Sequence, residues 1–479
     1  MKDGQKVCFI SGKFNVVHPG HLRLFRHAKE IADYLVVGVL ADDYHLAGDI
    51  LVPEADRIEG VRANIWVDEA FLAPEVGDAI LEIKPDIVLK GKEHEGGRNL
   101  EESLVTGYGG ILRFAGGDTR LSSSTLIRAE RDFEYASHSE TRGFLRRHGL
   151  FKSDLADLID SMSKIKTLVV GDLIVDRYID CQPVGLSAED PTIVVTPLAK
   201  KSFIGGAGIV AAHAAQLGSE SALVSIRGDD ATGEGAIKEL ADFNVNSHVL
   251  LDVDRPTTRK TRYRTNGKTL LRVNEMREHQ VDKDLEGILR DRIMKLIPEY
   301  DLVIFSDFSY GVLSETLIQD VISASKTIGL TIAADSQSSS QIGDVTKFSD
   351  VTLLTPTERE ARLAVRDSKS GLVGISEKLR KATNARYIPI TLASEGVFLH
   401  IPENDDSDWA DDQIPALNNN PIDVSGAGDA FLVSTAMCLA IGADIWSSIY
   451  LGSLSSACQV SRIGNVPLSR RELIEKLSS

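Results

Sequence analysis

Cysteine is scarce in this sequence, and long apolar runs are missing. The four cysteines, Cys8, Cys181, Cys438 and Cys458, are scattered along 479 residues without a CxxC pair. This excludes a zinc-binding pattern and a disulfide framework. No apolar run approaches the roughly 18 residues needed to cross a bilayer, and the opening MKDGQK leads into a strand pattern without an apolar signal region. These absences predict a cytoplasmic protein with reduced thiols.

Positive charge is also in deficit. The chain has 53 Lys and Arg against 70 Asp and Glu, a formal net charge of −17. This balance opposes binding to nucleic acid or to an anionic membrane, so an anionic ligand must be bound by local donors. The rest of the composition is that of a globular protein, 43% hydrophobic and 26% charged. Because single cores stop growing near roughly 250 to 300 residues, the length predicts two unequal domains, with three as the alternative.

Strand and helix patterns divide the chain into two α/β regions. In residues 1–130, apolar strands such as VCFIS and YLVVGVLA alternate with helical patterns, which predicts crossovers and a parallel sheet. The polar segment 131–152 is expected to connect this domain to a second one over residues 153–479. The second domain has α/β repeats and a strand-rich opening, in which Asn266-Gly267 predicts a hairpin turn.

The stretch GKFNVVHPGH, Gly12 to His21, is a Gly-rich turn between a strand pattern and a helix pattern. Backbone N–H groups at such a turn suit a phosphate. His18 and His21 would share one face, and imidazoles can donate to a phosphate whose charge grows during displacement. The alternative is an ordinary Pro-Gly turn with incidental histidines. A second anion site is expected at SSSTLIR, Ser122 to Arg128, which offers hydroxyls and an arginine at another helix start.

Together with DIVLKGKEHE, these segments resemble the signatures of the cytidylyltransferase-like nucleotidyltransferases. The resemblance implies a Rossmann-like domain in which a sugar phosphate oxygen attacks the α-phosphate of a nucleoside triphosphate and pyrophosphate leaves. It implies that His18 and His21 stabilise the pentacovalent phosphorus and that Lys13 and Lys90 neutralise charge. The other nucleotide contacts that it implies are Gly12, Phe14, Asp42, Ser124, Thr125 and Arg128. Asn15 stands where the family usually has Asp.

A second Gly-rich stretch, DVSGAGDAF, opens an apolar helix pattern near the other end of the chain. Two glycines before an acid at a helix start form a nest of N–H groups for a γ-phosphate and present Asp429 as a general base. The alternative is an Asp N-cap with a glycine turn.

This stretch and the segments FIGGAGIVAAHAAQLG, GDLIVDRY and RPTTRKTRYRTNGKTLLRVNE resemble the PfkB or ribokinase-like sugar kinases over about residues 165–470, and among them the heptose 7-phosphate kinases. The resemblance implies a ribokinase-like α/β domain with a small β-sheet lid, and phosphoryl transfer from ATP to a sugar hydroxyl. Asp429 would be the base, and Glu360 would help to place Mg²⁺. The implied anion hole is Gly426, Ala427 and Gly428, the nucleotide contacts are Ser394, Glu395 and Gly396, and the sugar contacts are Asp172, Asp176, Gly205, Gly206 and Arg262.

Three features of the kinase half bear on its substrate. Arg259, Lys260 and Arg262 form a basic cluster that either holds a phosphate already on the sugar or is a solvated charged face. Ile209 and Thr357 stand where related kinases carry Asn, and DFSYG and DSQ lack lysines that heptose kinases carry. These departures are compatible with a different sugar or a weakened kinase.

The two resemblances combined are typical of the bifunctional heptose kinase and adenylyltransferase family of lipopolysaccharide precursor synthesis, with the transferase first instead of the kinase. We expect phosphorylation of a sugar phosphate, heptose 7-phosphate by resemblance, and nucleotidyl transfer to a sugar 1-phosphate. One alternative is a kinase-like half that only binds ligand and regulates, and another is transfer of CMP to a polyol phosphate. The expected partners are a sugar phosphate, a nucleoside triphosphate and, through the strand-rich insert, a second copy of the chain, as in related sugar kinases.

Overall fold

The computed structural model describes residues 4–15, 17, 19–42, 52–91, 99–115, 141–190, 192–337, 343–401 and 411–478. The chain divides into two compact units. The first unit comprises residues 1–147, 367–378 and 394–415, and the second comprises residues 148–366, 379–393 and 416–479. In the described part of the chain, no helix combines the length and apolar character needed to cross a membrane.

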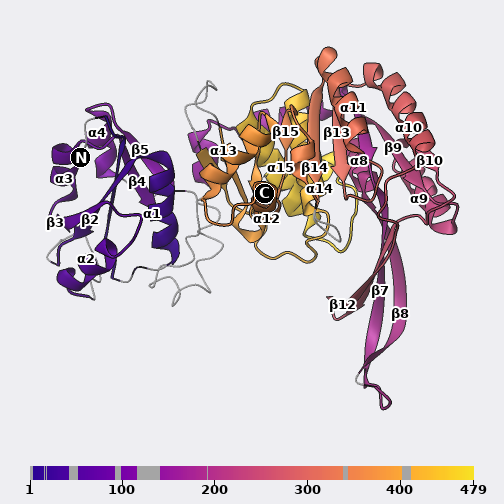
Figure 1. The fold of residues 1–479 in the computed structure, drawn as a ribbon, viewed down its shortest axis with the longest axis horizontal. Helices are drawn as coiled ribbons and strands as arrows, with labels where there is room; N and C mark the ends of the chain where they lie inside the picture. Colours follow the sequence, from indigo (N-terminus) through magenta and orange to yellow (C-terminus); the bar gives the residue numbers. More distant parts are fainter. Residues whose placement is uncertain are drawn as a thin grey trace. The chain divides into compact units, whose positions relative to one another are not determined.

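The first unit is built on a sheet of parallel strands in the order β3-β2-β1-β4-β5 (Figure 1). The chain order reverses between β1 and β4, which is the arrangement of a Rossmann-like domain and confirms the prediction. Its elements are β1 (Val7–Gly12), α1 (Pro19–Ile31), β2 (Tyr34–Leu40), α2 (Glu54–Arg62), β3 (Glu69–Ala73), α3 (Val76–Ile83), β4 (Ile87–Gly91), α4 (Leu100–Thr106) and β5 (Ile111–Ala115). The unit also includes the antiparallel pair β17 (Val397–His400) and β18 (Asp411–Ile414).

Both faces of this sheet are buried, which explains the continuous apolar strands of the sequence. Alternate residues of β1 enter two separate cores, because successive side chains of a strand point to opposite faces. Cys8 and Ile10 pack with α1 and α2, whereas Val7 and Phe9 pack with α3 and α4. A strand covered on both sides in this way reads as an unbroken apolar run.

The second unit contains a six-stranded parallel sheet in the order β10-β9-β6-β13-β14-β15. Its strands are β6 (Lys166–Gly171), β9 (Glu220–Arg227), β10 (Val245–Leu251), β13 (Leu302–Asp307), β14 (Thr331–Ser336) and β15 (Leu353–Leu354). The helices are α7 (Lys152–Ser161), α8 (Ala207–Gln216), α9 (Ala231–Asp242), α10 (Lys283–Leu296), α11 (Glu315–Thr327), α12 (Glu358–Ala364), α14 (Ala427–Ala440), α15 (Ile445–Gln459) and α16 (Arg470–Ser478), and α13 (Leu372–Thr383) is shared between the units. Helix α14 packs on α8 and α15, and α10 packs on α11.

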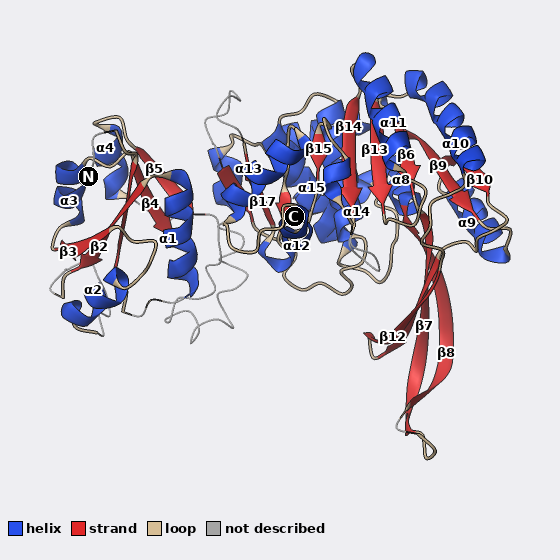
Figure 2. Ribbon diagram, viewed as in Figure 1, coloured by secondary structure: helices blue, strands red, loops and turns tan. Residues whose placement is uncertain are grey.

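A smaller four-stranded sheet, here called the lid, projects from this α/β body (Figure 2). Its strands are β7 (Leu173–Leu186), β8 (Ile193–Gly206), β11 (Arg259–Thr265) and β12 (Lys268–Glu275), in the order β12-β11-β7-β8. The β11–β12 hairpin turns at Asn266-Gly267, where both residues have positive φ, 49° and 79°. This is the turn that an Asn-Gly pair favours, and the predicted hairpin is confirmed.

Candidate active sites

The DVSGAGDAF motif forms the loop before α14 and the first turn of that helix. Gly426 is the N-cap residue, with a φ of 76°, a conformation that favours glycine. The first N–H groups of a helix have no partner within the helix. The residues Gly426, Ala427, Gly428 and Asp429 all line one cavity of the second unit, so the start of α14 presents donors and a carboxyl group to the same space.

Asp429 carries a perturbed carboxyl group. Burial raises the pKa of Asp429 from 3.8 to about 7, and a hydrogen bond from Gln337 opposes the increase. Gln337 Nε2 donates to Asp429 Oδ1 over 2.7 Å. A carboxyl group that titrates near neutral pH can take a proton from a hydroxyl and is suited to general base catalysis.

Asp176 enters the same cavity from lid strand β7. It forms an ion pair with Arg262 on β11, and both line the cavity together with Gly206 and Asp429. A Cβ atom on Gly205 would come within 2.5 Å of Asp176 Oδ2, so the position of this carboxylate requires glycine there. Three of the predicted sugar contacts, Asp176, Gly206 and Arg262, therefore line the same cavity as the predicted base, Asp429.

Asp172, another predicted sugar contact, is not among the residues that line this cavity. Its buried carboxylate accepts hydrogen bonds from the backbone N–H groups of Phe308, Tyr310 and Val312, over 2.8, 3.3 and 3.4 Å. Burial and neighbouring Asp307 raise the pKa of Asp172 to about 6. The backbone of the loop after β13 thus supplies the hydrogen bonds of the Asp172 carboxylate, and we infer that Asp172 positions that loop.

The basic cluster of β11 divides between the two faces of the strand. Lys260 and Arg262 line the cavity, whereas Arg259 forms an ion pair with a glutamate of β12. The Lys260 ammonium lies 4.5 Å and 5.2 Å from the ring centroids of Phe308 and Tyr310. Burial lowers the pKa of Lys260 to about 8. Of the three predicted cations, the structure therefore brings two to the cavity.

Two further carboxyl groups line this cavity. Asp335, at the end of β14, is buried, and its Oδ1 has no hydrogen-bond partner among the described residues. Burial and nearby Glu360 hold the pKa of Asp335 well above its ordinary value. Glu360 Oε2 accepts from Thr357 N and Oγ1 in the capping box of α12.

In the described ranges, no group of three or more His, Cys, Asp or Glu residues is arranged to hold a metal ion. A magnesium ion usually keeps several waters and binds only one or two protein carboxylates plus substrate phosphates. The orphaned Asp335 oxygen, with Glu360 beside it, fits that kind of site better than a cage made of protein ligands alone.

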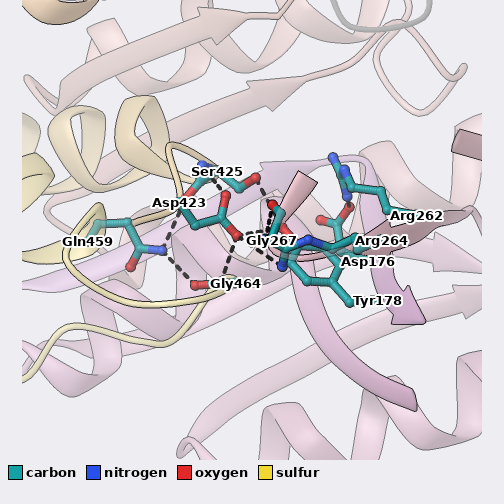
Figure 3. Close-up of polar contacts among 9 residues, drawn as sticks. All are labelled: Asp176, Tyr178, Arg262, Arg264, Gly267, Asp423, Ser425, Gln459 and Gly464. Atoms are coloured by element: carbon teal, nitrogen blue, oxygen red, sulfur yellow. Dashed lines mark hydrogen bonds and ion pairs between the residues drawn. The ribbon is translucent and has the colours of Figure 1, made fainter. Parts of the chain in front are cut away.

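A polar network ties the lid to the loop before α14 (Figure 3). The Tyr178 hydroxyl, on β7, lies 3.0 Å from Asp423 Oδ2 and 3.1 Å from Ser425 Oγ. Asp423 Oδ2 also accepts from Gly464 N over 3.0 Å and lies 4.0 Å from Arg264 Nη1. The Arg264 guanidinium stacks 4.6 Å from the centroid of the Tyr178 ring. The lid strands and the anion-hole loop are therefore directly connected.

Several cavity residues were missed by sequence reasoning, among them Asp335, Asn465 and Gln337. Asn465 lines the cavity and donates to Asp176, yet it lies in a short loop, RIGN, that carries no recognisable motif. Gln337, the partner of Asp429, lies in DSQ, and its only signal was the absence of a lysine that related kinases carry at this segment.

In the first unit, the predicted phosphate turn follows β1. Gly12 ends this strand, and Phe14 has a φ of 49°, which is uncommon for a residue with a side chain. The Phe14 ring packs edge-on against His21, in the first turn of α1, with 4.9 Å between ring centroids. The structure thus places Gly12, Lys13, Phe14 and His21 in one turn at the carboxyl end of β1.

Asp42 and Lys90 lie at the carboxyl ends of β2 and β4, the two strands that flank β1. Asp42 Oδ1 accepts a 2.6 Å hydrogen bond from Arg57 Nη2, which lowers the pKa of Asp42. The buried Arg57 also donates to the Lys13 carbonyl over 2.6 Å. Lys90 forms an ion pair of 2.8 Å with Glu101. Arg57, which sequence reasoning missed, therefore connects Asp42 to the phosphate turn.

Other predicted residues lie outside these clusters. His18, Ser124, Thr125 and Arg128 fall outside the described residues, so their roles stay predictions. Ser394 and Glu395 end a short 3-10 helix (Ala393–Glu395), and Gly396 precedes β17. None of these three is among the residues that line the cavity. Ile209 is fully buried in the core around α8.

Two family models match this chain. The model of the pfkB family carbohydrate kinases matches residues 164–470, and the cytidylyltransferase-like model matches residues 9–129. Among curated relatives, the "Bifunctional protein HldE" of Bradyrhizobium diazoefficiens is 30% identical over 68% of this chain and 65% of its own length. The protein of the same name from Campylobacter fetus is 30% identical over 66% of this chain and 67% of its own length. The chain thus spans about two thirds of the length of the relatives that it matches.

Solved structures share the fold of the second unit. Arabidopsis thaliana ribokinase complexed with ribose and ATP covers 66% of this chain and 99% of its own, with a TM-score of 0.52 and 17% identity. Escherichia coli phosphofructokinase-2 in complex with potassium covers 66% of this chain and 98% of its own, with a TM-score of 0.54 and 16% identity. The predicted ribokinase-like fold is confirmed, and so is its position after a cytidylyltransferase-like domain.

Proposed function

Because the chain belongs to the pfkB family of carbohydrate kinases, we propose that its second unit transfers the γ-phosphate of ATP to a sugar hydroxyl. The observation that carries this proposal is buried Asp429 at the start of α14, in one cavity with Asp176 and Arg262. Asp429 accepts the hydroxyl proton as the sugar oxygen attacks the γ-phosphorus, and the bond to the departing ADP breaks. The Gly428 N–H group at the start of α14 stabilises the developing charge, whereas the Ala427 N–H group donates to Val424 O over 3.4 Å.

We further propose that the sugar already carries a phosphate, bound by Lys260, Arg262 and Arg272. Arg272 on β12 stands directly opposite Arg262 on β11. Like charges in directly opposed positions destabilise a sheet, and a bound phosphate would add its negative charge to that of Asp176, which is paired with Arg262. Arg272 is also one of the charges that, after burial, lower the pKa of Lys260. By resemblance, the substrate is heptose 7-phosphate, phosphorylated at C1.

Replacing Arg272 should weaken binding of a phosphorylated sugar specifically. We expect Arg272→Gln to raise KM for heptose 7-phosphate about tenfold, because a hydrogen bond to a charged group is lost, with little change in kcat. The measurement is ADP formation with heptose 7-phosphate and with the unphosphorylated heptose. Arg259→Gln, on the same hairpin but paired with Glu275, is the matched control. An equal loss on both sugars, or no loss on either, would contradict the phosphate site.

Magnesium belongs to this proposal as a partner of ATP. Asp335 and Glu360 would hold it, directly or through water, and the ion would neutralise charge on the transferring phosphates. We place the reaction in the cytoplasm, where the four buried free cysteines stay reduced.

For the first unit we propose nucleotidyl transfer to a sugar 1-phosphate, with release of pyrophosphate. The support is the turn from Gly12 to His21 at the point where the strand order reverses, since ligands bind at such switch points. An oxygen of the sugar phosphate attacks the α-phosphorus, and His21 donates to the phosphate as its charge grows. The same chain would then add a phosphate at C1 of one sugar and transfer a nucleotide to the C1 phosphate of another. ATP is the nucleotide by resemblance, and CTP is the alternative that an assay separates.

We also propose that two chains associate through their lids. Leu186 and Ile193 face each other across β7 and β8, and their side chains are 71% and 64% exposed. Further exposed apolar side chains of the same hairpin are Val184, Val194 and Leu198. Apolar groups gathered on a projecting sheet are typical of a protein interface.

Charges introduced at this pair should separate the two chains. We expect the unaltered protein to sediment as a dimer and Leu186→Lys/Ile193→Lys to sediment as a monomer, because the lysines would have to be desolvated in the interface. Sedimentation equilibrium measures the mass directly. Ile328→Lys changes an equally apolar, half-exposed side chain after α11 and should leave the mass unchanged. An unchanged mass in the double variant would refute association through this hairpin.

A further inference from the structure

The side-chain amide of Asn465 has a defined orientation in the kinase cavity. Asn465 Nδ2 donates to Asp176 Oδ2 over 3.3 Å, and this carboxylate is paired with Arg262. A carboxylate in an ion pair only accepts hydrogen bonds, so the amide must turn its NH₂ group toward Asp176 and its oxygen away from it.

The amide oxygen, Asn465 Oδ1, lies above the anion hole. A Cβ atom on Gly426 would lie 2.5 Å from Asn465 Oδ1, which places this oxygen close above the Gly426 backbone. Asn465 is 8% exposed, and its Oδ1 has no hydrogen-bond partner in the part of the chain that the structure describes. Asn465, Gly426 and Asp429 line the same cavity. A buried acceptor in this position is satisfied when a donor enters the cavity.

The loop that carries Asn465 is held by the groups that also hold the anion hole (Figure 3). Asp423 Oδ2 accepts from Gly464 N over 3.0 Å, and Gln459 Nε2 donates to both Gly464 O and Ser425 O, over 3.0 and 3.1 Å. A Cβ atom on Gly464 would lie 2.3 Å from the Phe203 ring. The position of Asn465 relative to Gly426 is thus fixed by packing and hydrogen bonds, as a specificity contact requires.

The chemistry of the reactants decides which donor reaches Asn465. The ionised phosphates of ATP have acceptor oxygens and no donors, whereas each sugar hydroxyl has one. The attacking hydroxyl gives its proton to Asp429. We propose that Asn465 Oδ1 accepts a hydrogen bond from the neighbouring sugar hydroxyl, the one at C2 when C1 is phosphorylated, and that Asn465 is therefore a specificity-determining residue. This inference rests on the proposed kinase function.

The test compares the unaltered chain with Asn465→Ala on heptose 7-phosphate and on its 2-deoxy analogue, with ADP formation as the readout. Sites built to bind a hydroxyl reject analogues that lack it, so the unaltered chain should prefer the 2-hydroxyl substrate by about 100-fold in kcat/KM, and the variant by less than about fivefold. Asn418→Ala removes an asparagine that donates to Ala457 O and is not among the residues lining the cavity. This control should keep the full preference.

Several outcomes would overturn the inference. If Asn465→Ala loses activity by the same factor on both sugars, Asn465 only positions Asp176. If the unaltered chain has the same kcat/KM for the two sugars, no group of the site recognises the C2 hydroxyl. Should Asn465→Ala unfold in a thermal melt, Asn465→Ser undergoes the same comparison and has to lose the preference. Absence of phosphoryl transfer by the unaltered chain would instead refute the proposed kinase function, together with this inference.

Discussion

Asp429→Asn should lower kcat for phosphoryl transfer about 1,000-fold, within the range that general base catalysis contributes. Asparagine has nearly the same shape as aspartate and can still accept a hydrogen bond from Gln337, which lies 2.7 Å away. It cannot accept the proton of the attacking hydroxyl. We therefore expect KM for ATP and for the sugar to change little, since the anion-hole backbone and the sugar contacts stay in place.

Initial rates of ADP formation measure this effect. Asp444→Asn is the matched control, because Asp444 caps α15 by accepting from Ser447 N over 2.9 Å, and asparagine serves equally well as a cap. The control should keep its full rate. A kcat of Asp429→Asn above about a tenth of the unaltered value would be incompatible with a base that contributes at least 100-fold.

The pH dependence follows from the same residue. Burial raises the pKa of Asp429 from 3.8 to about 7, so the carboxylate that accepts the proton forms as the pH rises through that value. Transfer should therefore be about tenfold slower at pH 6 than on the alkaline plateau. A rate that is flat between pH 5 and 8 would show that another group, or none, accepts the proton.

The second large effect is expected in the first unit, where His21→Ala should slow nucleotidyl transfer about 100-fold. Removal of one donor to a phosphate that gains charge in the transition state typically costs this much. His21 lies in the first turn of α1 against Phe14. Loss of its ring therefore removes the donor and leaves the fold of the sheet in place.

Pyrophosphate release from ATP with a sugar 1-phosphate measures this reaction. Lys29→Ala, in the last turn of the same helix and paired with Asp68, is the control and should keep its rate. The kinase rate of His21→Ala should be unchanged, as should the nucleotidyl transfer rate of Asp429→Asn. Loss of both activities in either variant would indicate a shared site or unfolding, which a thermal melt distinguishes.

The local parts of both sites were predictable from sequence. The turn at Asn266-Gly267 and the helix start at Gly426 depend on a few consecutive residues, because positive φ and free helix N–H groups are local properties. The same holds for the turn that begins at Gly12. These motifs were found because glycine and polar residues interrupt apolar patterns at a fixed spacing.

The remaining parts depend on contacts between residues far apart in the chain. Asn465 meets Asp176 across 289 positions, and Tyr178 meets Asp423 across 245. No local pattern marks such a pair. For Asp172, a local pattern was present but predicted another role. An acid at a strand end is expected to bind a ligand, whereas the Asp172 carboxylate accepts hydrogen bonds from the loop after β13.

The sequence also could not predict which face of a strand lines the cavity. Alternation puts Arg259 on the face opposite Lys260 and Arg262, but which face meets the cavity depends on how the lid packs. In the structure, Lys260 and Arg262 line the cavity. Because charge patterns do not indicate burial, the partial burial of the cluster could not be foreseen.

The central claim is that Asp429 serves a sugar kinase in a chain that also carries a separate nucleotidyltransferase. Phosphorus NMR of the full chain with ATP, Mg²⁺ and heptose 7-phosphate tests it most directly, with Asp429→Asn and His21→Ala in parallel. We predict a new signal from the C1 phosphate of heptose 1,7-bisphosphate, with matching ADP, in the unaltered chain and in His21→Ala, and none in Asp429→Asn. A spectrum without phosphoryl transfer in the unaltered chain, or with equal transfer in Asp429→Asn, would contradict the claim.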